Sequence, residues 1–404
     1  MTKIIKLVYP TYLKQFQCIG GTCEDSCCIG WDVDIDRLTF RQYFRTKDST
    51  MREIFKTYVY KNEDSYSEVV DYGKVRLGVS MRCPFLDPDH YCKIYRTLGE
   101  SYLSNVCTSY PRVTNAVDDF YEVSLYISCP EAAKLILLNP DGIHFQESMQ
   151  PLDKHVIGSI VDTRLKEHQQ SPIKYFKEIR EKCIQLIQNR KYSLTHRLLI
   201  LGTFLENMEE KSEISQKSMI SYLKTFNPDS YPNLDNNTTN LPLLIRLFKN
   251  WIENLHALTK IDSVKFVAYT KIVQDSFMLS NSSNIIEQAS QYEESMIQFL
   301  NPFIQEHAYI FENDLVNLMF KNMFPFSQTH CMFDGYIMLI IHFLLTRFYL
   351  AAVFKHNKKA SSEDAVLLIQ VLAKTIDHNT FLDDLFHEIK VKEYDNMEFV
   401  KALL

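Results

Sequence analysis

Glycine is scarce in this chain, and the common nucleotide-binding motifs are missing. Its 404 residues include only 10 glycines and 2 tryptophans. The absence of G-x-G-x-x-G and P-loop patterns argues against a classical Rossmann-type methyltransferase or dehydrogenase. The nucleophile elbow G-x-S-x-G and the zinc motif H-E-x-x-H are also absent. Because glycine is the usual residue of tight turns between strands, low glycine with many Leu, Ile, Phe and Lys favours helices.

The chain has no strong charge bias and no clear export or membrane signal. The formal charge is −6, so we expect no nucleic-acid partner. The first residues, MTKIIKLVYP, lack the apolar run of a signal peptide. Residues 336–354 are strongly apolar but contain His342 and Arg347, and a central arginine is costly in lipid. We therefore predict a buried core helix there and a soluble, cytoplasmic protein that does not enter a membrane. The oligomeric state stays open.

Cysteine is concentrated near the start of the chain. Eight of the ten cysteines fall within the first 129 residues, at Cys18, Cys23, Cys27, Cys28, Cys83, Cys92, Cys107 and Cys129. Even spacing would put about three there, so the clustering needs a cause. A disulfide framework requires an oxidising compartment, and adjacent Cys27 and Cys28 bridge each other poorly. Buried apolar packing suits the isolated Cys183 and Cys331 better than the eight. Metal ligation by thiolates is the preferred interpretation.

The kind of metal is not fixed by the cysteine spacing. Two C-x2-C knuckles, expected of a zinc ribbon, are absent. Iron–sulfur clusters accept irregular spacing, and four thiolates hold one cubane. Eight candidates therefore allow two sites, or one site with additional packing or reactive cysteines. The radical-SAM signature C-x3-C-x2-C is incomplete, because Gly30 occupies the position of its third cysteine. This argues against membership of the radical-SAM family.

The pattern predicts a mainly α protein with a small, irregular α+β cysteine-rich N-terminal domain. We place that domain at residues 1–150 and a multi-helix domain at 151–404. In the N-terminal domain we expect an irregular segment at 1–35, followed by a helix over 36–46 that is capped by Asp34 or Asp36. We then expect short strands within 58–82 and a short helix over 98–112. A strand pair near 117–128 and a helix after Pro130 should complete this domain. After residue 150 we expect at least seven helices, with starts at Ser171, Ser361 and Thr380, a helix at 366–376 and a polar connector at 226–242.

The cysteine segments resemble the flagellin lysine N-methylase family. The resemblance is carried by the run from Phe16-Gln-Cys18 through Cys27-Cys28-Ile-Gly-Trp31, and by Cys83-Pro-Phe-Leu-Asp87, Cys92-Lys-Ile, Leu98-Gly-Glu, Leu103-Ser, Cys107-Thr-Ser-Tyr-Pro-Arg112 and Ser128-Cys129-Pro-Glu131. Weaker matches are Glu312-Asn-Asp-Leu-Val-Asn317, Phe324-Pro-Phe326 and 343–349. A related C-x3-C-C pattern occurs in small zinc- or iron-chelating domains. The resemblance spans most of the chain, and its first 131 residues are the specific part.

This resemblance implies a methyltransferase that modifies surface lysines of flagellin with S-adenosylmethionine as donor. It also implies an iron–sulfur cluster, expected to be [4Fe–4S], on the N-terminal cysteines. The helical region would then shape a groove for the substrate protein. Two rivals stay open: a metal-stabilised helical scaffold or sensor without turnover, and an iron–sulfur oxidoreductase.

Methylation of lysine sets requirements on the site. The amine attacks only when neutral, and at pH 7.4 its deprotonation costs roughly 4 kcal/mol. A tyrosine, aspartate or glutamate base is therefore expected. Tyr110 and Asp34 are the candidates we choose, with Tyr121 and Asp87 as alternatives. Arg112 could hold the carboxylate of the donor or an ion pair, and Trp31 could stack on adenine or pack beside the cluster.

Overall fold

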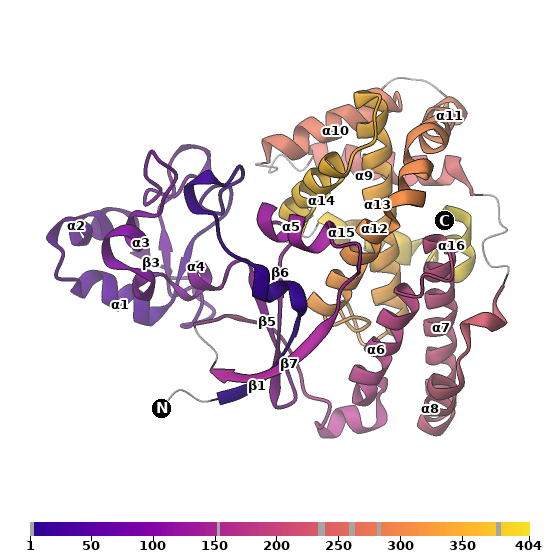
Figure 1. The fold of residues 1–404 in the computed structure, drawn as a ribbon, viewed down its shortest axis with the longest axis horizontal. Coiled ribbons are helices and arrows are strands. Elements are labelled where there is room, and N and C mark those ends of the chain that lie inside the picture. Colours follow the sequence, from indigo (N-terminus) through magenta and orange to yellow (C-terminus); the bar gives the residue numbers. More distant parts are fainter. Residues whose placement is uncertain (1–3, 152–153, 233–238, 258–262, 281–283, 377–380) are drawn as a thin grey trace. The chain divides into compact units, whose positions relative to one another are not determined.

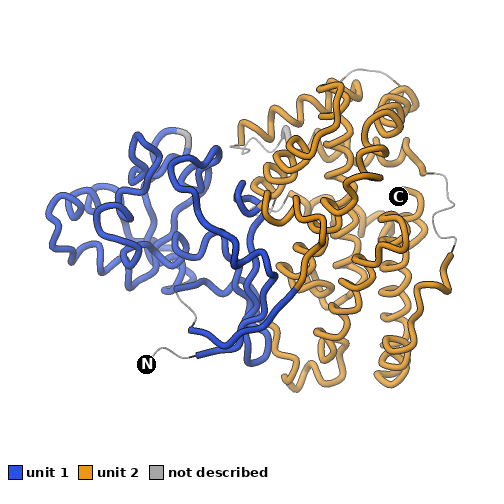
Figure 2. The backbone as a smooth tube through the Cα atoms, viewed as in Figure 1, with its two compact units in different colours: residues 1–132, 145–160 blue, residues 133–144, 161–404 orange. Residues whose placement is uncertain are grey.

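The computed structural model describes residues 4–151, 154–232, 239–257, 263–280, 284–376 and 381–404. Helices dominate the described chain, and its strands all lie before residue 162 (Figure 1). The predicted mainly α fold with a small N-terminal α+β part is therefore confirmed. Contacts divide the chain into two compact units, drawn in different colours in Figure 2. Unit 1 comprises residues 1–132 and 145–160, and unit 2 comprises residues 133–144 and 161–404. The domain limits 1–150 and 151–404 stay a prediction.

A five-stranded sheet has the order β7-β1-β6-β5-β8. Its strands are β1 (Ile4–Pro10), β5 (Arg112–Val117), β6 (Phe120–Leu125), β7 (Phe145–Pro151) and β8 (Ile157–Val161). β1 runs parallel to β6 and antiparallel to β7. The hairpin of β5 and β6, joined across Val117 and Phe120, confirms the predicted strand pair.

The expectation of an irregular segment over residues 1–35 is wrong for residues 4–10. Ile5, Leu7 and Tyr9 alternate with more exposed neighbours and are buried in a small core with Val123. This alternation is the period of a half-buried strand, and its partners β6 and β7 lie more than 100 residues later. Strand β8 was also not expected, because we predicted only helices after residue 150.

A second, smaller sheet and two helices contribute to another core cluster of unit 1, which also contains Cys83, Phe85 and Ile94. The sheet has the order β2-β4-β3, with β2 (Asp34–Ile35), β3 (Val59–Lys61) and β4 (Gly73–Val75). The helices are α1 (Arg37–Arg45) and α2 (Ser49–Tyr58), whose Tyr43 and Phe55 rings stack at 3.9 Å. The Asp36 carboxylate accepts from the Thr39 amide and caps α1, as predicted. The short strands expected within 58–82 are confirmed.

The single short helix expected over residues 98–112 is wrong in its extent. Helix α3 (Lys93–Leu98) ends at Gly99, whose φ of 88° ordinary residues rarely adopt. A 3-10 turn (Glu100–Tyr102) follows, and then α4 (Asn105–Ser109), capped by the Ser104 hydroxyl. Helix α4 still carries Cys107 and still ends before Pro111, as the sequence predicts.

Eleven α-helices follow residue 161 in the described chain, so the expectation of at least seven is confirmed. They are α6 (Phe176–Ile187), α7 (Leu194–Ile214), α8 (Gln216–Thr225), α9 (Leu241–Ala257), α10 (Val264–Ser276), α11 (Ile285–Ser295), α12 (Asn301–Lys321), α13 (Met332–Asn357), α14 (Ser362–Ile376), α15 (Phe381–Val391) and α16 (Met397–Leu403). Helix α5 (Pro130–Leu137) begins with its proline in the first turn, as predicted.

The predicted helix starts have different outcomes. Ser171 caps a 3-10 turn (Pro172–Tyr175) that leads into α6. The Ser361 hydroxyl accepts from the Asp364 amide at the start of α14, which includes residues 366–376. Thr380 lies outside the described residues. The described part of the connector at 226–242 contains a 3-10 turn, Pro228–Ser230.

Helix α13 is the central helix of unit 2 and contains the apolar stretch 336–354. It is long and apolar enough to cross a membrane by composition, but 94% of the apolar window is buried inside the protein. Nearly all its side chains from Met332 to Phe354 are covered by neighbouring helices such as α7, α10 and α11. This burial is the behaviour of a core helix, as the sequence predicts.

Candidate functional site

Four of the eight N-terminal cysteines share one folded region, and we call Cys28, Cys83, Cys92 and Cys107 the inner thiol set. The Cys83 amide donates to the Cys28 carbonyl at 2.9 Å. A β-bridge joins Leu86 to Cys92, so Cys83 and Cys92 lie on the two arms of one tight loop, as predicted. In that loop His90 takes a φ of 62°, in agreement with a turn role. These backbone contacts position three of the four thiols.

The fourth inner thiol is carried by α4. The Asn105 amide donates to Asp36 Oδ2 at 2.9 Å, which ties the first turn of α4 to the start of α1. The Cys107 amide donates to the Ser104 hydroxyl at 3.2 Å. Burial raises the pKa of Cys107 to about 12, and the charges of Cys28 and Cys92 act in the same direction. Cys28 and Cys92 are therefore electrostatic neighbours of Cys107.

The remaining thiols form a second group, which we call the outer thiol set: Cys18, Cys23 and Cys129. Burial raises the pKa of Cys129 to about 11, with smaller contributions from Cys23 and Cys18. Burial also raises the pKa of Cys23, and the charge of Cys18 adds to this effect. By these electrostatic interactions Cys18, Cys23 and Cys129 group with one another, a division that the sequence spacing alone did not indicate.

Cys27 lies between the two sets and is coupled to its neighbour. A hydrogen bond from Cys27 lowers the pKa of Cys28 and raises that of Cys27 itself, because the bond stabilises the Cys28 thiolate. The positive charge of Arg82 also lowers the pKa of Cys28. Charges on Cys107 and Cys18 both act on Cys27, which places it near each set. Cys28 is therefore the member of the pair that ionises first.

Thiolates are soft donors of the kind that zinc ions and iron–sulfur clusters both take. All ten cysteines are free thiols, which excludes disulfides in this structure. Within the described residues, no three His, Cys, Asp or Glu side chains are arranged to hold one metal ion. A single ion requires every sulfur within about 2.3 Å of one point, whereas a four-iron cluster offers each thiolate its own iron.

The two chosen base candidates lie beside different thiols. Tyr110 contacts the Ser128 hydroxyl at 3.2 Å, and the charges of Cys129 and Cys27 act on its phenol. Asp34, on β2, acts electrostatically on Cys107 and lies 3.8 Å from the Lys74 ammonium. Burial raises the pKa of both groups. A raised pKa keeps the tyrosine protonated at neutral pH, whereas it brings the aspartate closer to the range useful for a base.

The two alternative bases are engaged in structural contacts. Asp87 lies 2.6 Å from Arg96 and accepts from the Tyr91 amide, and these contacts lower its pKa. Tyr121 pairs with Leu7 in the five-stranded sheet and contacts the His155 ring. Neither environment favours a proton acceptor for a substrate amine.

Arg112 and Trp31, the predicted donor-binding residues, are placed differently. Arg112 begins β5 and is exposed, with its guanidinium over the Phe16 ring at 5.4 Å. It has no ion pair with any described residue, so its charge is available to a ligand. Trp31 packs edge-on against Tyr110 at 5.1 Å, and its indole N–H donates to the Cys27 carbonyl at 2.8 Å. This contact supports the packing role that the sequence left open for Trp31.

The structure also contains a buried polar cluster in unit 2 that the sequence did not indicate. The Glu312 carboxylate contacts Arg197 at 2.7 Å and Arg190 at 2.9 Å. Next to it, the Asn313 amide donates to the carbonyls of Ile136 and Asn139 at 2.9 and 2.8 Å. Asp314 lies 2.9 Å from His342 on α13. The Glu-Asn-Asp run therefore joins α12 to α7, α13 and the segment after α5.

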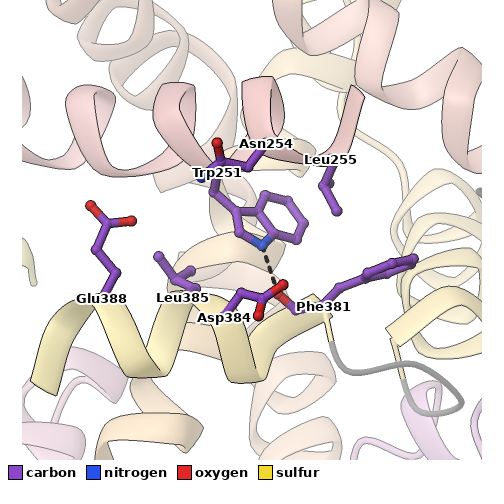
Figure 3. A pocket seen from close by; sticks show the side chains of 7 residues that line it. All are labelled: Trp251, Asn254, Leu255, Phe381, Asp384, Leu385 and Glu388. Carbon is purple, nitrogen blue, oxygen red and sulfur yellow. Dashed lines mark hydrogen bonds between the residues drawn. The ribbon is translucent and has the colours of Figure 1, made fainter. Parts of the chain in front are cut away.

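Figure 3 shows a small pocket in unit 2, between α9 and α15. Its volume is about 20 Å³, and it lies between Trp251 and the carboxylates of Asp384 and Glu388. The Trp251 indole N–H donates to the Phe381 carbonyl at 2.9 Å beside it. This volume holds about one water molecule, far less than a nucleoside-containing donor needs.

One family match covers the C-terminal part of the chain, beyond the cysteine segments. A family model described as "FliB lysine N-methylase C-terminal domain" matches residues 180–403. A lysine-N-methylase of Salmonella typhimurium is 29% identical over 219 residues, which are 54% of this chain and 51% of that protein. The chain thus spans about half the length of this relative. No solved structure matches the chain.

A second relative is similar over a shorter part of the chain. The flagellar biosynthetic protein FliU of Salmonella muenchen is 33% identical over 146 residues, which are 36% of this chain and 85% of that protein. Together with the family model, which covers more than half of the chain, this similarity confirms the predicted family. The chain belongs to the FliB lysine N-methylase family.

Proposed function

We propose that this protein is an S-adenosylmethionine-dependent lysine N-methyltransferase that modifies flagellin in the cytoplasm. The observation that carries the proposal is the family match over residues 180–403. The names of the relatives, a lysine-N-methylase and a flagellar biosynthetic protein, support the reaction and the substrate. The net charge of −6 is consistent with a protein partner that presents lysines.

We infer that the inner thiol set holds a [4Fe–4S] cluster. Cys28, Cys83, Cys92 and Cys107 are four neighbouring soft donors, and a cubane takes four thiolates. When bound, the cluster would supply a Lewis-acidic iron that binds S-adenosylmethionine, a path for electrons or a cross-link that stabilises the fold. The outer thiols would then pack or react beside it.

The residues of the chain account for the proton of the methyl transfer. The neutral lysine nitrogen forms a bond to the methyl carbon, the methyl–sulfur bond breaks, and the sulfur leaves as a neutral thioether. The ammonium must first lose a proton, and Asp34 is the base we favour. Its partly buried carboxylate has a raised pKa, and its Oδ1 atom is covered by the protein and has no hydrogen-bond donor. Tyr110 is better suited to donate a hydrogen bond, because its pKa is raised well above the usual value.

A methylation assay tests the proposal. Protein purified without oxygen is incubated with flagellin and S-adenosylmethionine, and flagellin is examined by peptide mass spectrometry. We expect mass increments of about 14 Da on surface lysines, and none without the donor or on flagellin whose lysines are acetylated. Donor binding without any mass change would contradict the flagellin substrate. Neither donor binding nor mass change would favour the metal-stabilised scaffold, and redox cycling alone would favour the oxidoreductase.

A further inference from the structure

Asp36 has a buried carboxylate whose two oxygens serve two different helices of unit 1. The residue is 2% exposed and has no ion pair with any residue in the described ranges. Its Oδ1 accepts from the Thr39 amide at 2.9 Å, in the first turn of α1. Its Oδ2 accepts from the Asn105 amide at 2.9 Å, at the first residue of α4. Amides at helix N-termini carry partial positive charge, so these two donors offset the burial of the carboxylate.

Asp48 shows what capping a helix requires in the same unit. One oxygen of its carboxylate accepts from the Met51 amide at 2.8 Å and caps α2. Within the described chain, the Asp48 side chain has no further hydrogen bond. Capping α1 therefore does not require the second bond of Asp36, which joins residues 69 positions apart. This second bond connects two elements of the fold.

Helix α4 depends on contacts outside itself for its position. It has five residues, and an isolated helix of that length is not stable in water. The Ser104 hydroxyl caps it locally by accepting from the Cys107 amide. The Asn105 side chain donates to the Val69 carbonyl at 3.0 Å. Together with these contacts, the bond to Asp36 determines where α4 holds the Cys107 thiol.

The other members of the inner thiol set pack in the core beside Asp36. Ile35, the preceding residue, lies in one buried cluster with Cys83. Cys28 and Cys92 pack against this cluster. The segment of Ile35 and Asp36 is therefore connected with three of the thiols through the core, and with the fourth through α4.

We propose that Asp36 is a positioning residue that fixes Cys107 relative to the rest of the inner thiol set. It acts through the Asn105 amide, at the start of the helix that carries the thiol. Partners that hold a metal ligand in place commonly change metal affinity when they are removed. The effect on a bound metal rests on the proposed cluster, whereas the effect on the position of α4 does not.

Asn105→Pro removes the amide that donates to Asp36. Proline is favoured at the first position of a helix, and Ser104 already has the extended backbone, with φ −66° and ψ 163°, that a residue before proline adopts. Asn105→Ala is the matched control, because it keeps the amide. Both variants lose the side-chain bond to Val69, so the difference between them reports on the bond to Asp36.

A second pair of variants tests the same bond from the carboxylate. Serine is a good helix cap, so Asp36→Ser and Asp48→Ser should each keep the cap of their own helix. Only Asp36→Ser loses an acceptor for a second helix, because a serine has one side-chain oxygen. This pair decides the question if Asn105→Pro does not fold.

Hydrogen exchange and metal release are measured on the whole chain purified without oxygen. In Asn105→Pro and Asp36→Ser we expect exchange in residues 106–110 to be about tenfold faster or more, because a bond to a charged acceptor is lost. Both variants should also release their metal to a chelator about tenfold faster. The electron paramagnetic resonance spectrum of the reduced cluster should change in these two variants and stay the same in the two controls.

Unchanged exchange in both Asn105→Pro and Asp36→Ser would overturn the proposal. Faster exchange with unchanged metal release and an unchanged spectrum would also overturn it, because Asp36 would then support only the fold. Zinc in place of iron would refute the proposed cluster, and the rate of zinc release would still decide the role of Asp36. If the unmodified protein holds no metal, the cluster fails, and exchange alone decides whether Asp36 fixes Cys107.

Discussion

Glu312 Oε2 lies 2.7 Å from Arg197 Nη1, and each of these two side chains is no more than 3% exposed. The pair is completed by Arg190, which contacts the other carboxylate oxygen and the Pro140 carbonyl. Nearby, Gly142 has a φ of 83°, and a Cβ there would lie 3.1 Å from Glu312 Oε1. The segment after α5 is thus fitted closely around this carboxylate, which makes Glu312 a structural centre of unit 2.

Glu312→Gln should lower the free energy of unfolding by about 3 kcal/mol or more, because it leaves the Arg197 charge buried without a counter-charge. Denaturant titration measures the change. Glu294→Gln is the control: Glu294 pairs with Lys355 at 2.9 Å but is 59% exposed, so its loss should cost about 1 kcal/mol or less. Equal losses of unfolding free energy in the two variants would show that the buried network contributes no more to stability than the exposed ion pair.

Asn313→Ala should destabilise the protein by about 1–3 kcal/mol, since the carbonyls of Ile136 and Asn139 would each lose a buried hydrogen bond. Hydrogen exchange should then become faster in the segment 136–143. Asn313→Asp should be at least as damaging, because a carboxylate cannot donate to either carbonyl. Unchanged exchange in both variants would contradict an anchoring role for Asn313.

Iron binding should depend on the inner thiol set. Cys107→Ser and Cys28→Ser should lose most of the iron and acid-labile sulfide found after purification without oxygen, whereas Cys18→Ser should keep it. Cys183→Ala is the control, because Cys183 is fully buried in α6, away from the N-terminal cysteines along the chain. Iron loss only in the outer-set variants would reverse the assignment, and zinc without sulfide would exclude the cluster.

The pH profile of methylation activity should fall on its acidic side as Asp34 becomes protonated. Burial raises the folded-state pKa of this carboxyl, so its basic form is lost at a higher pH than for an ordinary aspartate. Activity should therefore fall as pH decreases through that raised value. Asp34→Asn should lower kcat about a hundredfold and remove this limb, with KM little changed. A pH profile that is identical in Asp34→Asn would exclude Asp34 as the base.

The sequence predicts much of unit 2 and the local elements of unit 1, because these depend on residues close together in the chain. Helix periodicity, the Asp36 cap and Pro130 in the first turn are signals of this local kind. Strand β1 was not predicted, because it is stabilised by pairing with β6 and β7, which lie far away in the sequence. The Glu312 and Arg197 pair was missed for the same reason, since 115 residues separate its members. Cysteine clustering indicated metal chemistry, but only the folded chain divides the thiols into two sets.

The position of β1 also governs the order in which the chain can assemble during synthesis. Ile4–Pro10 is synthesised before both of its partner strands, and the later one, β7, ends at Pro151. Strand β1 therefore stays without a partner until β6 (Phe120–Leu125) has been translated, and its antiparallel pairing must wait until β7 is complete. All eight N-terminal cysteines emerge during this interval, so we expect iron delivery and sheet closure to be competing events in the nascent protein.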